Sequence, residues 1–541
     1  MLDYFTSPQE PRWTRWLLLV FIPVLVLYYV AAKGNSETKN HDVYANDQKV
    51  YLNTALKIAH DPAGYFTPRQ RTPGYPYFLA LFYSKDKFDV PEGSKPPFDL
   101  AWFERGKTIN LNLSIVLLAG LFLFCWWLLP LVEAGLVAVA SGLLLFTFKA
   151  GYVQPELSYW VLNTILFVLL GRMLLTPTWR LALVCGVLSV VTYMVKAGTQ
   201  PLLFLFVVTW AIKLLWDWFS FRWRDRHGSL DEGEEAPRIA ILAGQGAIVI
   251  LVYLVLLIPY FTGTKKVFGD PFFSVYTKYM MWLPMKDDSF LADRDYMWGF
   301  YYSGARSKPI TVDEFNEGFE RAKRARLKKE AGGKLTDAEL DAKLAEEFRP
   351  VTELASRENY FEKYPLSHGI DRVEYGMMMT QKRLKKYYKR AMDMIEYAIK
   401  LALAALILRA IMWLWERFRP GRKFPVADLG EDGSSPLATV ARRPYLIFYL
   451  LGFFLGYYVL YAWYDALGIG PRLVLSLYLP LLFVAVMGMN LAFRGLAVPG
   501  LIGGRPLYLG KVANVLLVVM LVYLSCKLMT GELYEFANTG G

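Results

Sequence analysis

Cysteine and histidine are scarce in this sequence, and their scarcity excludes two kinds of site. Only three of the 541 residues are Cys and four are His. All three Cys lie inside apolar runs, so neither a disulfide framework nor a metal cluster is expected. A cleavable signal peptide is not expected either, because the first apolar run (Trp16 to Ala32) is too long and lacks a convincing cleavage site.

Long apolar runs are what the sequence has in abundance. Apolar residues make up 55% of the chain, and runs of roughly 18 residues or more, enough to cross a bilayer core, recur along it. The chain is therefore expected to be a polytopic membrane protein. About eleven spans are predicted, over residues 16–32, 109–128, 130–149, 157–175, 180–196, 200–217, 239–260, 395–415, 444–464, 472–493 and 512–529.

Basic residues in the short loops give the predicted orientation. They share one side of the membrane if the N-terminus is cytoplasmic, as the positive-inside bias requires. They are Arg12, Arg15, Arg222, Arg224, Arg226, Arg417, Arg419, Arg422, Lys423, Arg442, Arg443, Arg494, Arg505 and Lys511. The net charge of +12 is thus assigned to the membrane surface and not to nucleic-acid binding.

Three parts follow from this orientation. The first is an N-terminal transmembrane module (1–260), whose first loop outside the cytoplasm covers residues 33–107. The second is a large extracytoplasmic segment (261–392) with a charged helical pattern, long enough for a small domain. The third is a C-terminal transmembrane module (393–541).

A polar stretch in the first outer loop stands out from this apolar background. Asn46 is predicted to cap a helix with Asp47 in its first turn. Arg69 and Arg71 follow, and then a stiff Thr-Pro-Gly-Tyr-Pro turn that includes Tyr75. We interpret this loop as half of an active site; the alternative is that Asp47 only complements the helix dipole. The helix is expected to have an apolar face with helical spacing, formed by Val50, Leu52, Ala55, Leu56 and Ala59.

Four short motifs, all predicted at the outer face, resemble those of one family. They are Asp47-Gln48-Lys49-Val50-Tyr51-Leu52, Arg71-Thr72-Pro73-Gly74-Tyr75-Pro76, Gln154-Pro155-Glu156-Leu157-Ser158 and Pro471-Arg472-Leu473-Val474-Leu475-Ser476-Leu477-Tyr478-Leu479-Pro480. Together they are similar to the GT-C superfamily of membrane glycosyltransferases. The likeness is to the branch with protein O-mannosyltransferases, the lipid A aminoarabinose transferase and bacterial arabinosyltransferases. It covers the first seven spans and reaches the C-terminal half only in the tenth.

The resemblance implies both a fold and a chemistry. The fold is an all-α polytopic membrane protein, a GT-C-type bundle of about eleven transmembrane helices whose extracytoplasmic loops carry amphipathic juxtamembrane helices. Members transfer sugars outside the cytoplasm from polyprenyl- or dolichyl-phosphate donors. The family's catalytic carboxylate falls on Asp47 by position, and Glu156 can supply a second. The alternative for Glu156 is a first-turn helix acid that follows Pro155.

Cations near the outer face are candidates to bind the donor phosphate, because negative charge accumulates there as the glycosidic bond breaks. They are Arg69, Arg71, Lys149, Lys196 and Arg472. Each of them has an alternative role as an interfacial anchor of its helix. Tyr75 and His368 complete the predicted substrate contacts. No His spacing indicates a zinc site, and a divalent metal, which some relatives use, is left open.

The sequence thus predicts an integral-membrane inverting glycosyltransferase in the plasma (inner) membrane. It would transfer a sugar from a polyprenyl-phosphate donor to an extracytoplasmic glycan, lipid or protein acceptor, with membrane lipids as its other partners. The alternative from another class is a transporter or flippase of lipid-linked sugars, against which the nearly charge-free span centres argue. A ligase or polymerase that uses a lipid-diphosphate donor is the alternative within enzymology.

Overall fold

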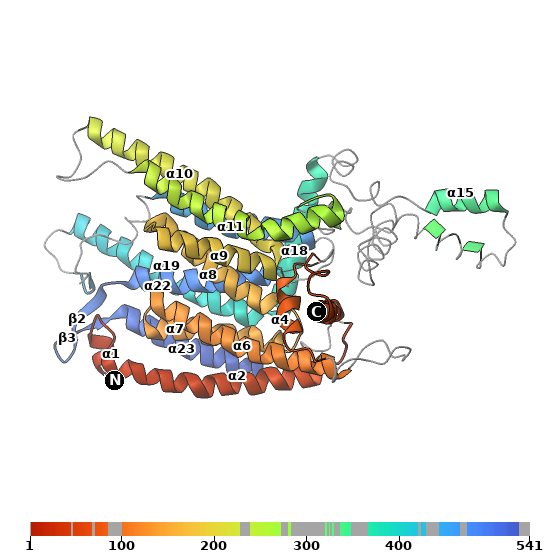
Figure 1. Ribbon diagram of the computed structural model, residues 1–541. Coiled ribbons are helices and arrows are strands. Elements are labelled where there is room, and N and C mark those ends of the chain that lie inside the picture. Colours follow the sequence, from red (N-terminus) through yellow and green to blue (C-terminus); the bar gives the residue numbers. More distant parts are fainter. Residues whose placement is uncertain are drawn as a thin grey trace.

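The chain folds into a bundle of long apolar helices (Figure 1). The computed structural model describes residues 2–44, 47–67, 71–84, 100–227, 238–271, 280–282, 320–321, 324, 327–328, 336–347, 366–419, 424–428, 443–465 and 473–529. Within them, ten helices are long and apolar enough to cross a membrane, and an eleventh apolar helix, Trp179–Val195, is shorter. The multi-pass helical architecture is therefore confirmed, and each predicted span coincides with an apolar helix.

The helices that coincide with the predicted spans follow one another in the order of the chain. They are α2 (Leu17–Lys39), α6 (Leu100–Leu128), α7 (Leu131–Leu144), α8 (Glu156–Leu175), α9 (Trp179–Val195), α10 (Gln200–Arg226), α11 (Ile239–Phe268), α19 (Lys389–Phe418), α21 (Pro444–Asp465), α22 (Tyr478–Phe493) and α23 (Leu509–Lys527). In an apolar 18-residue stretch of each span, 83% of the residues are buried for the span that contains α7, 72% for α8 and only 11% for the span around α2. The centre of the bundle is therefore built on α7 and α8, and α2 presents apolar side chains to its surroundings.

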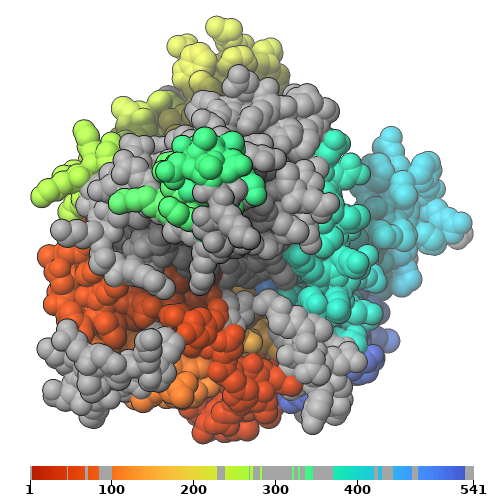
Figure 2. Space-filling view, turned by 90° about the vertical axis from the view of Figure 1, so that its right-hand side faces the viewer, coloured from red at the N-terminus to blue at the C-terminus, as the bar shows by residue number. Residues whose placement is uncertain are grey.

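Shorter elements mark the two ends of the bundle (Figure 1). We call one the loop end, because it carries α3 (Gln48–His60), α4 (Gly74–Ala80), α15 (Asp337–Glu347) and α18 (Leu366–Tyr387). The other is the N-terminal end, where α1 (Leu2–Thr6) lies beside the small sheet. Figure 2 views the loop end: the orange-red residues of the first loop lie on its left and the teal residues of α18 on its right.

The small sheet is a departure from the all-α prediction. It has three antiparallel strands in the order β1 (Ala427–Asp428), β2 (Leu496–Ile502) and β3 (Arg505–Tyr508). The β2–β3 turn contains Gly503 and Gly504, whose φ angles of 54° and 80° are those that a tight hairpin requires and that glycine adopts without strain. The sheet is tied to the bundle by Arg409, whose guanidinium donates to the Ala492 carbonyl at 2.9 Å and to the Asp428 carboxylate.

Two apolar clusters hold the bundle together, and both combine helices from the two predicted transmembrane modules. The larger joins α2, α6, α7 and α8 to α19, α22 and α23. The second joins α8, α9, α10 and α11 to α21. The central helix α8 contributes to both, so the modules that the sequence divides at the large outer segment share one continuous core.

Candidate active site

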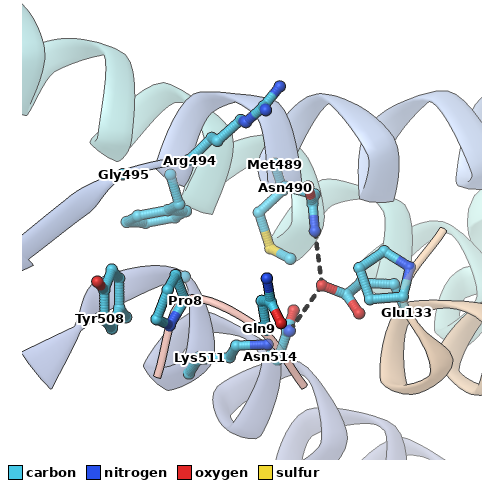
Figure 3. Close-up of a pocket in the computed structure, with 13 residues that line it drawn as sticks. Pro8, Gln9, Glu133, Met489, Asn490, Arg494, Gly495, Tyr508, Lys511 and Asn514 are labelled. Carbon is cyan, nitrogen blue, oxygen red and sulfur yellow. Dashed lines mark hydrogen bonds between the residues drawn. The ribbon is translucent and has the colours of Figure 1, made fainter. Parts of the chain in front are cut away.

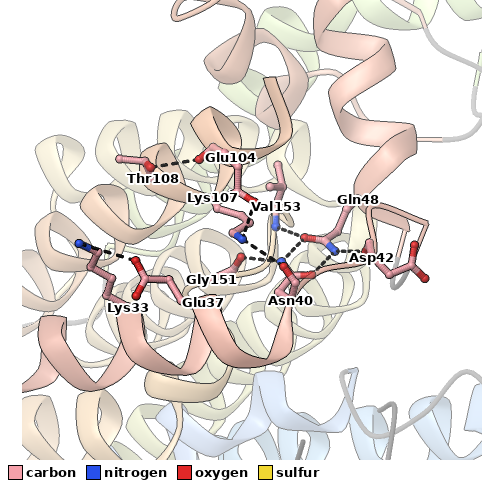
Figure 4. A network of polar contacts seen from close by, with 10 residues as sticks. All are labelled: Lys33, Glu37, Asn40, Asp42, Gln48, Glu104, Lys107, Thr108, Gly151 and Val153. Carbon is pink, nitrogen blue, oxygen red and sulfur yellow. Dashed lines mark hydrogen bonds and ion pairs between the residues drawn. The ribbon is translucent and has the colours of Figure 1, made fainter. Parts of the chain in front are cut away.

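The first loop is fastened to the bundle by a buried pair of side-chain amides (Figure 4). Asn40, which follows α2, and Gln48, which begins α3, exchange two hydrogen bonds of 2.8 Å each. Asn40 also donates to the Gly151 carbonyl at 2.8 Å, and the Gln48 side-chain oxygen accepts from the Val153 backbone N–H at 2.9 Å. The start of α3 is therefore docked on the segment that leads into α8. Both amides are buried, so these bonds satisfy groups that would otherwise be costly to desolvate.

Asp47 lies at the N-cap of α3, and the prediction that Asn46 caps this helix with Asp47 inside it is corrected. Its φ of 67° is the only positive value for a non-glycine residue in the described part of the chain. Asp is one of the few residue types that tolerate this conformation. The carboxylate makes no capping hydrogen bond; instead Arg71 donates to its Oδ2 at 2.8 Å. The first predicted carboxylate is thus paired with one of the predicted cations.

The apolar face of α3 differs in phase from the predicted one. Of the five residues predicted to form it, Leu52 and Ala55 are buried, Val50 and Leu56 are half-buried, and Ala59 is exposed. The residues that are buried instead are Tyr51 and Ile58, together with Gln48. The amide contacts of Gln48 fix the rotation of the helix about its axis, and periodicity alone could not reveal them.

The turn after Arg71 brings Tyr75 into the same region. Tyr75 is 2% exposed, and its hydroxyl donates to Asn110 Oδ1 at 3.1 Å. Asn110 in turn donates to the carbonyls of Ala150 and Tyr152 at 3.0 and 2.6 Å. Burial, followed by the negative charge of Glu156, raises the pKa of Tyr75 well above its ordinary value. Tyr75 therefore remains a neutral hydroxyl group at physiological pH.

The second predicted carboxylate also has a predicted cation beside it. Glu156 is the first residue of α8 and is 3% exposed. Lys196, the residue after α9, donates to Glu156 Oε1 at 3.2 Å. The Lys196 ammonium also lies 5.5 Å from the centroid of the Tyr159 ring. Since α8 and α9 are consecutive antiparallel helices, this pair joins the start of one to the end of the other.

The two ion pairs belong to one site. Arg71 lies over the Tyr51 ring at 5.7 Å, and the Tyr51 and Tyr75 rings meet edge to face at 5.5 Å. The negative charge of Glu156 contributes to the raised pKa of Tyr75, so the second pair is also near Tyr75. The turn after Arg71 approaches the end of α9 closely because it carries Gly74. A Cβ atom at Gly74 would lie 2.6 Å from the carbonyl oxygen of Met194, two residues before Lys196.

The other predicted site residues lie partly outside the described chain. Arg69 and Arg472 fall outside the described residues. His368 lies in the first turn of α18, and its side chain is outside the described part. Lys149 is buried, with its ammonium 5.4 Å from the Tyr152 ring. Among the described residues, no group of three His, Cys, Asp or Glu could hold a metal ion.

A second polar cluster at the loop end was not predicted from the sequence. Asp465, the last residue of α21, is buried and accepts from Thr380 at 2.7 Å and from Arg383. Earlier on α18, the helix that carries Thr380 and Arg383, lies the fully buried Arg372. Its guanidinium is 4.3 Å from the centroid of the Trp463 ring and donates to the Met281 carbonyl at 3.0 Å. The signal was present in the sequence, because an acid that closes an apolar span needs a partner.

None of the protein-family models, curated proteins or solved structures compared with this chain matches it. The GT-C resemblance of its four motifs therefore stays a prediction. Function is inferred below from the geometry of the site.

Proposed function

We propose that this protein is an integral-membrane inverting glycosyltransferase of the GT-C type that uses a polyprenyl-phosphate sugar. One observation supports this most directly: two carboxylates and two cations, drawn from four separate segments, meet at one end of the bundle. Asp47 pairs with Arg71 at 2.8 Å and Glu156 with Lys196 at 3.2 Å. A purely structural role would not require both pairs to meet around one buried tyrosine, Tyr75.

Each member of the cluster has a place in an inverting transfer. The acceptor hydroxyl attacks the anomeric carbon, the bond from that carbon to the lipid phosphate breaks, and the hydroxyl proton passes to a carboxylate. Asp47 is the proposed base, with the Arg71 guanidinium holding its orientation by a charge-assisted hydrogen bond. Lys196 is the proposed partner of the departing phosphate, where it would stabilise the negative charge that develops. Glu156 and Tyr75 would hold Lys196 and orient the sugar.

The distribution of charge supports placing this site outside the cytoplasm. The short segments at the N-terminal end of the bundle are rich in basic residues: Arg12, Arg15, Arg222, Arg224, Arg226, Arg417, Arg419, Arg443, Arg494, Arg505 and Lys511. Cytoplasmic loops carry such an excess. The loop end is basic too, above all over Lys382–Arg390, but its charges belong to long segments, which cross the membrane largely regardless of charge. The loop end, with its two ion pairs, would then face the outside of the plasma (inner) membrane, where the sugar acceptor would be a glycan, a lipid or a protein.

A transporter of lipid-linked sugars is supported less well. Transport sites use ionisable groups near the middle of the membrane. The buried Glu133 lies in the first turn of α7. The buried Lys213 lies at the middle of α10, but it is paired with Asp217 one turn further along the same helix. Glu133 is therefore not near the middle of its helix, and the charge of Lys213 is balanced by Asp217 on the same helix.

The deciding experiment measures sugar transfer by purified protein in lipid, with Asp47→Asn as the test variant. Asn keeps the shape of the side chain and tolerates the same positive φ, but it cannot accept the proton. Donor binding and the melting temperature should stay close to wild type, while transfer falls by about 10²–10⁴-fold. Glu37→Gln is the matched control, because Glu37 is an exposed acid of the same loop end that pairs, among the described residues, with the exposed Lys33 at 3.7 Å.

Transfer within a few-fold of wild type, in a variant that binds donor and melts normally, would remove Asp47 from the mechanism. Glu156→Gln would then be tested in the same assay. If the wild-type protein transfers no sugar from any polyprenyl-phosphate donor, the proposed function itself is wrong.

A further inference from the structure

A cavity of about 340 Å³ (Figure 3) lies at the N-terminal end of the bundle, and the candidate active site lies at the opposite, loop end (Figure 1). The segment before α2 covers one side of it with Pro8 and Gln9. That segment is fixed in place by Glu10, whose carboxylate accepts from the backbone N–H groups of Leu131 and Val132 at 3.0 and 3.3 Å. The volume is at the lower end of the range for small-molecule sites, so it suits a small polar group rather than a whole lipid.

The inner wall of the cavity carries a buried carboxylate. Glu133 is 2% exposed, and its Oε1 accepts from the amides of Asn490 and Asn514 at 2.7 and 2.8 Å (Figure 3). Its Oε2 and the side-chain oxygen of Asn514 are buried and have no hydrogen-bond partner among the described residues. Buried polar atoms nearly always have one. Glu133 Oε2 and Asn514 Oδ1 are therefore two buried acceptors that lack a donor within the described chain.

Two cations lie on the same cavity, nearer its mouth. Arg494 is exposed and comes directly after α22, one turn beyond Asn490. Lys511 lies on α23, one turn before Asn514. Each of these helices thus presents an amide toward Glu133 and a cation closer to its end. Lys511 is 9% exposed and its ammonium lies 4.8 Å from the Tyr4 ring. Within the described chain, neither cation has an ion-pair partner.

We propose that this cavity binds an aminoalkyl phosphate, the chemistry of an ethanolamine phospholipid headgroup. Its primary ammonium has three N–H donors for the inner acceptors on Glu133 and Asn514, and it neutralises the buried carboxylate. Its phosphate, two carbons away, meets the Lys511 ammonium by a charge-assisted hydrogen bond, and the exposed Arg494 attracts it toward the cavity electrostatically. A choline headgroup carries the same charges but has no N–H to donate, and a glycerol headgroup has no cation.

Two sources can supply this group, and binding measurements distinguish them. Purified full-length protein is titrated in detergent with phosphatidylethanolamine, with phosphatidylcholine and phosphatidylglycerol of the same acyl chains, and with soluble O-phosphoethanolamine, while the melting temperature is recorded. Phosphatidylethanolamine should raise the melting temperature more than the other two lipids do. A response to the lipid alone assigns a membrane source, and a response to O-phosphoethanolamine alone assigns a soluble one.

Variants connect the response to the cavity. Glu133→Gln and Lys511→Met should each raise the half-saturating ligand concentration by at least about tenfold, as expected for a lost charged hydrogen bond. Arg417→Gln is the matched control, because Arg417 is an exposed cation at the end of α19 that does not line the cavity. If Glu133→Gln does not fold, Lys511→Met and Arg494→Gln at the mouth provide the test.

The proposal is overturned if phosphatidylcholine stabilises the protein as well as phosphatidylethanolamine does, if neither form of the aminoalkyl phosphate changes the melting temperature, or if Lys511→Met and Arg494→Gln keep the wild-type response. Sugar transfer is not the readout, so these results are independent of the proposed glycosyltransferase activity.

Discussion

The side-chain oxygen of Gln48 accepts a hydrogen bond from the backbone N–H of Val153 at 2.9 Å, across 105 residues of chain. Gln48 follows Asp47, and Val153 precedes Glu156 by three residues. This one contact therefore fixes the distance between the segments that carry the two predicted carboxylates. The amide pair with Asn40 makes the same junction rigid from the side of α2.

The pair of Glu156 and Lys196 should behave as a coupled unit. Lys196→Met leaves a buried carboxylate without its cation and should destabilise the protein by about 3–5 kcal/mol. Adding Glu156→Gln to that variant should recover part of the loss, which gives a coupling energy of about 0.5–3 kcal/mol. Thermal or denaturant unfolding of the two single variants and the double variant measures this. Additive losses would show that the two side chains do not interact.

Gly74→Ala should loosen the first loop. The new Cβ would lie 2.6 Å from the Met194 carbonyl oxygen, a backbone atom that cannot move aside, and such overpacking costs about 1–3 kcal/mol. Gly120→Ala is the matched control, since a Cβ at Gly120 meets nothing within 4 Å. The comparison is made by melting temperature. Equal stability of both variants would mean that the turn does not approach α9 this closely.

The backbone at Asp47 can be tested separately from its charge. Asp47→Gly and Asp47→Ala both lose the Arg71 ion pair, but only glycine adopts the φ of 67° without strain. The Gly variant should therefore be more stable than the Ala variant by about 1 kcal/mol. The opposite order, measured by denaturant unfolding, would be incompatible with a left-handed residue at the N-cap of α3.

The orientation of the bundle can be checked by labelling with a membrane-impermeant thiol reagent. Cys125 and Cys185 are buried, and Cys526 is exposed, so the background chain carries Cys526→Ser. Lys343→Cys on α15 and Glu416→Cys near the end of α19 are both exposed sites. We expect Lys343→Cys to react in intact cells and Glu416→Cys to react only after the membrane is opened. The reverse pattern would put the candidate site in the cytoplasm.

Much of the helical bundle could be predicted because lipid imposes a simple requirement on the sequence. An apolar run must be long enough to cross the membrane, and this requirement does not depend on which helices are neighbours. The site was harder to predict because it depends on pairing. The sequence indicates Asp47, Arg71, Glu156 and Lys196 as candidates, but only the fold shows which carboxylate meets which cation.

Polar residues within or beside apolar spans were the main omission. Asn110 holds Tyr75, and Asn490 and Asn514 hold Glu133, yet none of these has a periodic pattern. Their signal is the cost of a polar group among apolar ones, which implies a partner without identifying it. Gly503-Gly504 is a local signal for the β2–β3 hairpin, but the strands on either side are too short and irregular for their sequence to predict a sheet.

The short helix α9 has a consequence for the membrane itself. Its 17 residues rise about 26 Å, less than the roughly 30 Å of a typical hydrocarbon core. Thr178 caps its first turn at 3.2 Å, and Lys196 follows its last residue. If both ends are to reach water, the bilayer must thin around α9, and thinning costs a fraction of a kcal/mol per Å. Lys196 then lies at the headgroup boundary of the thinned bilayer, the level at which the phosphate of the proposed donor would lie. Acyl-chain length should therefore affect how closely the two meet.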